Sequence, residues 1–415
     1  MLGPREAARR IVDALVPLPV ESRALMEADG AVVAATLHAP IAMPRWRNSA
    51  MDGFACHAAD VATATAAAPV RLPIVGSVRA GDDVPPALAR GAAMRVATGA
   101  PVPDGCDSVI RVEDTTTASD TVSIADARDA GRNVRRAGED VHQGAVVARA
   151  GDRLHPGRIG FLASVGIREV SVHRAVRVAI IATGDELVTL EDFDAAARPP
   201  RIVSSNSVSL VAAVRALGAI PIDHGIIRDD AEALTRALEA AAASADLVLT
   251  TAGVSVGEYD HVKQCVQGLG GRVDLWRVRM RPGSPLAAGH IAGTPWIGLP
   301  GNPVSTLVTF TLFAAPAIRR LAGATAVYPR PVPVRTHDTV QPAPTLTQFL
   351  RVAIDSDDDG TLRARSSGVQ ASNIVSSLAG ADAVLIVPPG DAPIPGGSLL
   401  QAIPLGSDPL LSSTP

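Results

Sequence analysis

The sequence contains very little lysine and cysteine. Lys263 is the one lysine among 38 basic residues in a chain of 415, so nearly all positive side chains are arginines. The three cysteines, Cys56, Cys106 and Cys265, are odd in number and far apart, which argues against a disulfide framework or a Cys-x-x-Cys metal site. The nine histidines show no HxxxH or HxH spacing, so no histidine metal centre is predicted.

Membrane and nucleic-acid signals are also missing. No uninterrupted apolar run reaches the roughly 18 to 20 residues that a membrane helix needs. The charged N-terminus, residues 1–10, lacks the apolar core of a signal peptide. A formal net charge of −4 gives no general attraction to nucleic acid or to an anionic membrane. We therefore expect a soluble, cytoplasmic protein that acts on small molecules.

The length and the patterning predict a mixed α/β, multidomain fold. Strand and helix patterns alternate through residues 176–326, which is typical of a doubly wound, mostly parallel sheet with helices on both faces. The expected domains are an elongated connector (1–46 and 141–175), a small β-rich domain (47–140), the doubly wound α/β domain (176–326) and a small C-terminal β domain (327–415).

Three predicted strands of the α/β domain each run into a short polar loop. The loops are Gly184-Asp-Glu186, Gly253-Val-Ser-Val-Gly-Glu-Tyr-Asp260 and Gly301-Asn-Pro-Val-Ser305. In such a sheet, ligands bind beyond the carboxyl ends of the strands. The glycines permit close backbone approach, and the amides at a helix start favour an anion such as phosphate. The loops therefore predict one ligand site, although each loop alone could be an ordinary turn or helix cap, with Asn302 as the N-cap.

Six motifs in the same order closely resemble the molybdopterin molybdotransferase family, the bacterial relatives of the gephyrin E domain. The motifs are Ser49-Ala-Met-Asp-Gly53, Ala97-Thr-Gly-Ala-Pro-Val-Pro103, Asn133-Val-Arg-Arg-Ala-Gly-Glu-Asp140, Thr183-Gly-Asp-Glu-Leu187, Gly253-Val-Ser-Val-Gly257 with Asp260, and Gly298-Leu-Pro-Gly-Asn-Pro-Val-Ser305. The resemblance runs almost end to end. It implies an elongated homodimer that inserts molybdate into adenylylated molybdopterin with release of AMP, and possibly an interaction with the adenylyltransferase of the same pathway.

The resemblance also implies roles for individual residues. Asp185, Glu186 and Asp260 supply hard oxygen ligands that suit Mg²⁺, which would offset the charge of an adenylyl phosphate. Substrate-binding positions are Asp52, Thr98, Gly99, Asp140, Gly253, Ser255, Gly257, Asn302 and Ser305. Asp52, Thr98 and Asp140 would face the site of the partner subunit. Plain turns and solvated charges are the alternative interpretations of these three residues.

The chain departs from the family pattern in the expected molybdate pocket. The family usually has Lys-Pro-Gly-Lys-Pro, and this chain has Arg281-Pro-Gly-Ser-Pro285. Arg281 keeps a positive charge, whereas Ser284 supplies none. Arg351 and Ser372 are the other candidates for the pocket, with a surface arginine and a turn serine as the alternatives. Ala252 replaces a usual glycine, and only a backbone with positive φ would make that replacement unfavourable.

Two other functions are alternatives to the transferase. A paralogue that binds molybdopterin as a carrier or scaffold, with weak metal insertion, is suggested by Ser284 and Ala252. The intact carboxylates at 185, 186 and 260 favour the enzyme instead. A generic nucleotide-binding protein is disfavoured because the chain has neither a P-loop nor a GxGxxG motif after the first strand of the sheet.

Overall fold

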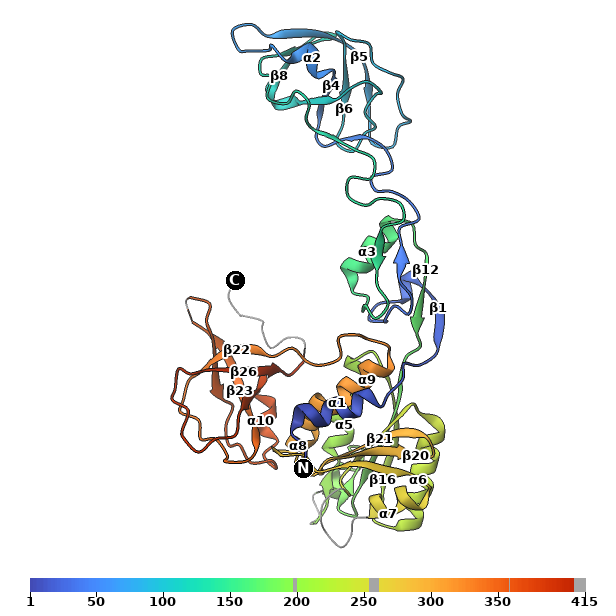
Figure 1. The fold of residues 1–415 in the computed structure, drawn as a ribbon, viewed down its shortest axis with the longest axis vertical. Helices are drawn as coiled ribbons and strands as arrows, with labels where there is room; N and C mark the ends of the chain where they lie inside the picture. The colour runs from blue at the N-terminus through green and yellow to red at the C-terminus, as the bar shows by residue number, and fades with distance from the viewer. Residues whose placement is uncertain (197–199, 254–260, 358, 407–415) are drawn as a thin grey trace.

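The computed structural model describes residues 1–196, 200–253, 261–357 and 359–406. The molecule is elongated, with the α/β unit and the C-terminal sheet at one end and a small β unit at the other (Figure 1). A narrow connector joins the two ends, and the chain runs through it twice. The predicted mixed α/β, multidomain architecture is confirmed, while the domain boundaries given above stay predictions.

A six-stranded sheet forms the centre of the α/β unit. Its strands, in spatial order, are β16 (Ile220–Ile227), β13 (Arg177–Thr183), β17 (Leu247–Thr251), β21 (Thr294–Leu299), β20 (Ala287–Ile291) and β18 (Arg272–Trp276). The first four strands pair in parallel, and the pairings of β21 with β20 and of β20 with β18 are antiparallel. The predicted mostly parallel sheet is therefore correct, with β20 running against the other five strands.

Helices cover both faces of this sheet, because successive side chains of a strand point in opposite directions and both sets are apolar. On one face, Val178 and Ile180 pack with α5 (Ser205–Ala216), α8 (Pro303–Thr309) and α9 (Ala315–Leu321). On the other face, Ala179 and Ile181 pack with α6 (Ala231–Ser244) and α7 (His261–Gly268). Burial on both faces explains why β13 is a continuous apolar run in the sequence.

The N-terminal helix α1 (Pro4–Asp13) packs on the α/β unit. Ala7, Ala8 and Ile11 belong to the same buried cluster as Val178 and the helices α8 and α9. The domains expected from the sequence place this segment in the connector, within residues 1–46. A helical pattern in a sequence predicts a helix, but it cannot show which neighbouring element covers the apolar face of that helix.

The other units are small and rich in β-structure. The connector contains β1 (Val20–Ala24) paired with β12 (Glu169–His173), β2 (Leu37–His38) paired with β11 (Val146–Ala148), and α3 (Pro156–Ser164). The small β unit has the strand order β7 (Ser108–Arg111), β4 (Gly53–Cys56), β6 (Ala93–Val96), β5 (Val70–Val78), β9 (Thr121–Ile124) and β8 (Thr115–Ala118), with α2 (Ala58–Val61) and the pair β3 (Asn48–Ser49) and β10 (Val134–Arg135). The C-terminal sheet has the order β19 (Met280–Arg281), β23 (Thr347–Ser356), β24 (Leu362–Ser366), β22 (Val332–Thr336), β26 (Leu399–Pro404) and β25 (Ala383–Val387), with α10 (Ser376–Ala379). Because β23 also pairs with β25, this sheet curls back on itself.

The three cysteines and one long apolar helical segment lie in the interior of the protein. All three cysteines are buried and free, as expected for a chain without a disulfide framework. One helical segment, Pro303–Leu321, is long and apolar enough by composition to cross a membrane, although the sequence contains no uninterrupted apolar run of that length. Its most apolar window is 78% buried within the protein, as expected for a core helix. This segment runs from α8 to α9 through a π-helical turn at residues 310–314.

A buried carboxylate ties the exit of the connector to the sheet. Asp246 precedes β17 and accepts hydrogen bonds from Arg174 Nη1 and Nη2, both at 2.6 Å, and from the backbone N–H of Arg177 at 2.9 Å. Burial alone would raise the pKa of Asp246, but the hydrogen bonds from Arg174 and Arg177 outweigh it and lower the pKa to about 2. The junction is therefore held by a charged pair in which Asp246 is almost completely enclosed.

We expect Asp246→Asn to lower the free energy of unfolding of the α/β unit by about 2 to 4 kcal/mol, because it leaves Arg174 without its charged partner. Urea unfolding followed by tryptophan fluorescence reports on this unit through Trp276 and Trp296. Glu232→Gln, which removes an exposed pair with Arg236, is the control and should not move the midpoint.

The same pair predicts a pH dependence. The folded-state pKa of Asp246 lies below the unfolded-state value of about 3.9, so the pair stabilises above about pH 4, and this contribution is lost as the pH falls toward 2. Asp246→Asn should remove that part of the acid dependence. An unchanged acid profile in the variant would contradict the assignment.

Candidate active-site cleft

A cleft with a volume of about 990 Å³ lies at the carboxyl ends of β13, β17 and β21. Loops of the C-terminal unit close one of its sides. The structure brings together in its lining the predicted residues Glu186, Gly253, Arg281, Ser284, Asn302, Ser305 and Ser372. The residues that line the cleft therefore come from two units of the fold.

The first loop follows β13 and carries two exposed carboxylates. Glu186 lines the cleft, whereas Asp185 lies beside it and is not part of the lining. Gly184 is buried with φ of 147°, and a Cβ at this position would lie 2.6 Å from the Glu186 carboxylate. Arg201 donates a hydrogen bond to the backbone carbonyl of Asp185. A side chain at 184 would therefore displace Glu186 from its place in the cleft.

The second loop follows β17 and begins with two left-handed residues. Ala252 has φ of 70° and Gly253 has φ of 67°. A Cβ on Gly253 would approach Val262 Cγ2 to 2.3 Å, so glycine is needed there for space as well as for conformation. Ala252 therefore has the positive φ that makes alanine less favourable than glycine at this position. The predicted residues Ser255, Gly257 and Asp260 lie outside the described residues.

The third loop follows β21 and starts α8. Asn302 is the N-cap and Pro303 the first helical residue, as predicted, but the Asn302 side chain makes no capping hydrogen bond. Instead, Asn302 Nδ2 donates to Ser372 Oγ at 3.0 Å and so connects the α/β unit to the C-terminal unit. The predicted residue Ser305 is buried at the floor of the cleft.

The expected molybdate loop runs between the two units. Arg281 lies in β19, which pairs with the start of β23 in the C-terminal sheet. The Arg281 side chain is exposed and makes no hydrogen bond or ion pair with any other residue that the structure describes. Ser284 Oγ donates to the carbonyl of Val278 at 2.9 Å, so the serine proton is used within the loop. The positive charge of this loop therefore comes from Arg281.

Arg351 lies neither in the lining of the cleft nor at the surface. It is fully buried, so it is not a surface arginine, and it is not among the residues that line the cleft. Its Nε donates to Ser377 Oγ at 2.9 Å, and its Nη2 donates to the carbonyls of Val369 and Ala371. Nη1 is buried without a hydrogen-bond partner among the described atoms. Arg351 therefore supports the turn that carries Ser372 into the cleft.

The predicted residues of the small β unit lie far from this cleft within one chain (Figure 1). Thr98 donates to Asp52 Oδ1 from its backbone N–H at 2.7 Å and from Oγ1 at 3.1 Å, and both side chains are exposed. Gly99 donates its N–H to the carbonyl of Ser49 at 2.8 Å. Asp140 is exposed, and its backbone N–H donates to the carbonyl of Met43 at 3.1 Å. The structure therefore places Asp52 and Thr98 together, but away from Glu186 and Arg281.

Several cleft residues were missed in the sequence. Ser204, Ser205 and Asn206 line the cleft at the start of α5, and Gln370 and Asn373 line it from the C-terminal unit. Asn206 Nδ2 donates to the carbonyl of Gly301 at 2.7 Å, which fixes the third loop. Within the described part of the chain, no group of three or more His, Cys, Asp or Glu side chains is arranged to hold a metal ion.

The fold and the cleft define a multidomain α/β protein that binds a small molecule at the carboxyl edge of its sheet. Family comparisons agree with this class. Residues 3–166 match "MoeA N-terminal region (domain I and II)", residues 179–320 match "Probable molybdopterin binding domain", and residues 333–405 match "MoeA C-terminal region (domain IV)".

Individual relatives give the particular family. A molybdopterin molybdenumtransferase of Nostoc sp. is 36% identical over 377 residues, covering 90% of this chain and 86% of the relative. The Staphylococcus aureus protein of the same name is 30% identical over 407 residues, covering 97% of this chain and 96% of the relative. A molybdopterin biosynthesis moeA protein structure from Pyrococcus horikoshii OT3 is 27% identical, with a TM-score of 0.82 over 98% of this chain and all of that chain. The chain belongs to the molybdopterin molybdenumtransferase family.

The left-handed backbone at position 252 leads to a stability prediction. A non-glycine residue in this conformation costs roughly 1 to 2 kcal/mol, so Ala252→Gly should stabilise the protein by about 0.5 to 1 kcal/mol after the added chain entropy of glycine is subtracted. Ala240→Gly, on the exposed side of α6, is the control and should destabilise by about 1 kcal/mol. Thermal unfolding of both variants checks the opposite signs, and a loss of stability in Ala252→Gly would contradict the strain.

Proposed function

We propose that this chain inserts molybdate into adenylylated molybdopterin, with release of AMP, during molybdenum cofactor biosynthesis. The observation that carries the proposal is the cleft, in which a carboxylate, Glu186, and a cation, Arg281, line one cavity of about 990 Å³. A cavity of this size suits a pterin with a nucleotide attached. Membership in the molybdopterin molybdenumtransferase family supports the same reaction.

The residues of the cleft have the chemistry that this reaction needs. Arg281 offers a guanidinium without an internal partner among the described residues, and a guanidinium binds an oxyanion through two parallel N–H groups. Asn302 and Ser372, joined at 3.0 Å, offer neutral polar groups to the pterin or phosphate. Ser284 contributes no charge, and its hydroxyl donates a hydrogen bond to the carbonyl of Val278.

We further propose that Asp185, Glu186 and Asp260 hold Mg²⁺ during the reaction. The two described carboxylates fit such an ion, because both are exposed oxygen donors beside the cleft and Arg201 bonds to the backbone of Asp185 rather than to its carboxylate. When bound, a divalent ion supplies positive charge against the adenylyl phosphate. The role of the protein chain is to hold the carboxylates at the strand end.

The test of this function is AMP release by the purified protein with adenylylated molybdopterin, Mg²⁺ and molybdate. We expect molybdate-dependent release, and we expect Glu186→Gln to reduce it by about 100-fold or more, because charge that holds the cation is removed. Glu191→Gln, an exposed carboxylate five residues further on, is the control. Near wild-type turnover of Glu186→Gln with unchanged Mg²⁺ dependence would remove Glu186 from the site.

We propose a homodimer in which the Asp52 and Thr98 pair of one subunit completes the cleft of its partner. The support is that these exposed residues match the family motifs yet lie far from the cleft in their own chain. An Asp52→Ala chain mixed with a Glu186→Gln chain should recover activity, because one of the two sites in each mixed dimer is intact. Verified subunit exchange without recovery would mean that each site is built within one chain.

The serine at position 284 predicts weak molybdate binding. A charge-assisted hydrogen bond contributes about 1.5 to 3 kcal/mol, roughly twice a neutral one, so Ser284→Lys should lower the molybdate concentration for half-saturation by about tenfold. Ser284→Ala is the matched control and should leave half-saturation nearly unchanged, because the hydroxyl bonds to Val278 and not to the anion. An unchanged value in a folded Ser284→Lys variant would show that Arg281 suffices.

The engaged hydroxyl of Ser284 also favours a second candidate function. In it, the chain binds molybdopterin as a carrier or scaffold and inserts metal poorly. The two functions differ in the same assay, because a carrier would bind the adenylylated pterin without releasing AMP when molybdate is added.

A further inference from the structure

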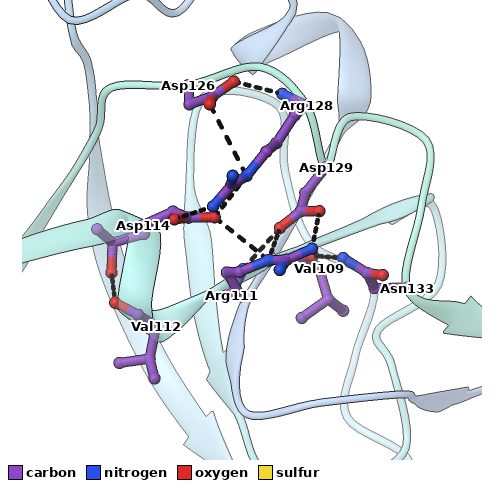
Figure 2. Close-up of polar contacts among 9 residues, drawn as sticks. Val109, Arg111, Val112, Asp114, Asp126, Arg128, Asp129 and Asn133 are labelled. Atoms are coloured by element: carbon purple, nitrogen blue, oxygen red, sulfur yellow. Dashed lines mark hydrogen bonds and ion pairs between the residues drawn. The ribbon is translucent and has the colours of Figure 1, made fainter.

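An ion pair between the buried carboxylate of Asp129 and the partly exposed Arg111 lies in the small β unit (Figure 2). The Asp129 side chain is 2% exposed and accepts hydrogen bonds from Arg111 through Nε at 2.9 Å, Nη2 at 2.9 Å and the backbone N–H at 3.2 Å. The Arg111 side chain is the main cause that lowers the pKa of Asp129 to about 2, against the opposing effect of burial. Asp129 therefore stays ionised and bound to Arg111 at neutral pH.

Arg111 fixes one flank of the Asp52 turn. It ends β7, where it lies opposite Gly53 in β4. The next residue, Val112, donates its N–H to the carbonyl of Asp52 at 3.1 Å. The backbone at Asp52 is thus attached to the strand end that the Asp129 carboxylate holds.

Asn133 fixes the other flank. It has a positive φ of 68°, which must be maintained by its surroundings. Its Nδ2 donates to the carbonyl of Val109 at 2.9 Å, its carbonyl accepts the N–H of Ala50 at 2.9 Å, and its side chain also helps to lower the pKa of Asp129. The Asp129 carboxylate therefore bonds to Arg111 on one flank of the turn at residues 49–53, and the Asp129 carbonyl accepts the N–H of Arg132, the neighbour of Asn133 on the other flank, at 3.0 Å.

The network continues to the surface through Asp114, which lies 3.2 Å from Arg111 Nε and accepts a hydrogen bond from Arg128 Nε at 2.8 Å (Figure 2). Arg128 Nε also lies 3.7 Å from Asp126, and the Arg128 and Asp126 side chains are about half exposed. Exposed pairs of this kind contribute little because water and salt screen them. The pair of Arg111 with buried Asp129 can therefore be compared with the exposed pair of Arg128 with Asp126 in the same network.

We propose that Arg111 and Asp129 are positioning residues that act on the reaction through the Asp52 and Thr98 pair. This inference rests on the proposed function. Asp52 is exposed, and its side chain accepts hydrogen bonds only from Thr98 among the described residues, so its direction depends on the backbone beneath it. A shift of this backbone moves Asp52 without removing any group that touches substrate.

The first experiment compares Asp129→Asn with Asp126→Asn, the same change at the exposed end of the network. We expect Asp129→Asn to lower kcat/KM by about tenfold or more, because misplacement of a reacting geometry by an ångström is enough for such a loss. Asp126→Asn should behave like wild type. Arg111→Lys keeps the charge but loses the forked contact, and it should give a loss in the same direction if Asp129→Asn does not fold.

A double-mutant cycle separates positioning from general destabilisation. On an Asp52→Ala background, Asp129→Asn should cost less than about twofold, because its effect passes through Asp52. On a Glu191→Gln background, its full effect should remain, because this exposed carboxylate does not line the cleft. Equal losses on the wild-type and Asp52→Ala backgrounds would overturn the proposal.

Amide exchange tests the positioning role without any measurement of catalytic activity. The Thr98 N–H donates to Asp52, so Asp129→Asn should speed amide exchange in residues 97–100, measured by mass spectrometry, while Asp126→Asn should not. If the wild-type protein releases no AMP, the proposed function fails, and amide exchange still decides whether Asp129 holds this turn. Unchanged exchange in a folded Asp129→Asn variant would overturn the positioning role.

Discussion

The register of three parallel strands determines where the three polar loops of the α/β unit lie. Ala182 of β13 is opposite Thr251 of β17, and Thr251 is opposite Leu299 of β21, so the three strands end at the same level. Apolar side chains buried on both faces hold this alignment, because a slip of one residue would exchange the side chains of the two faces. The loops that follow are therefore adjacent in space although they are distant in sequence.

The cleft also depends on contacts between the α/β unit and the C-terminal unit. The short strand β19 leaves the α/β unit and pairs with β23, and Asn302 bonds to Ser372 across the same junction. Buried Arg351 holds the turn that carries Ser372. An anion at Arg281 would thus meet groups from two units, and their relative position is part of the binding site.

One residue with a strained backbone lies beside the ligand site. Ala252 adopts a left-handed backbone at the end of β17, and the neighbouring Gly253 has no room for a side chain. Such strain persists only where the surrounding structure maintains it, and here the N–H of Ala252 is held by the carbonyl of Leu299 at 3.1 Å. The small β unit shows the same arrangement, because the left-handed Asn133 is held by contacts beneath the Asp52 turn.

The sequence by itself determined the doubly wound sheet, the three polar loops at its carboxyl edge and the family, because strand periodicity, glycine spacing and helix-start residues are local signals. It also predicted Asp52 and Thr98 as substrate-binding residues, and the structure joins these two residues by hydrogen bonds. Tertiary structure decided that Arg351 is buried within the C-terminal unit, where it bonds to the turn before Ser372, that Asn302 bonds to Ser372 instead of capping α8, and that α1 packs on the α/β unit. It also decided that Ala252 has a positive φ. These features depend on which distant segments meet, and the hydrogen-bond partner or packing neighbour of a side chain cannot be deduced from its own segment of sequence.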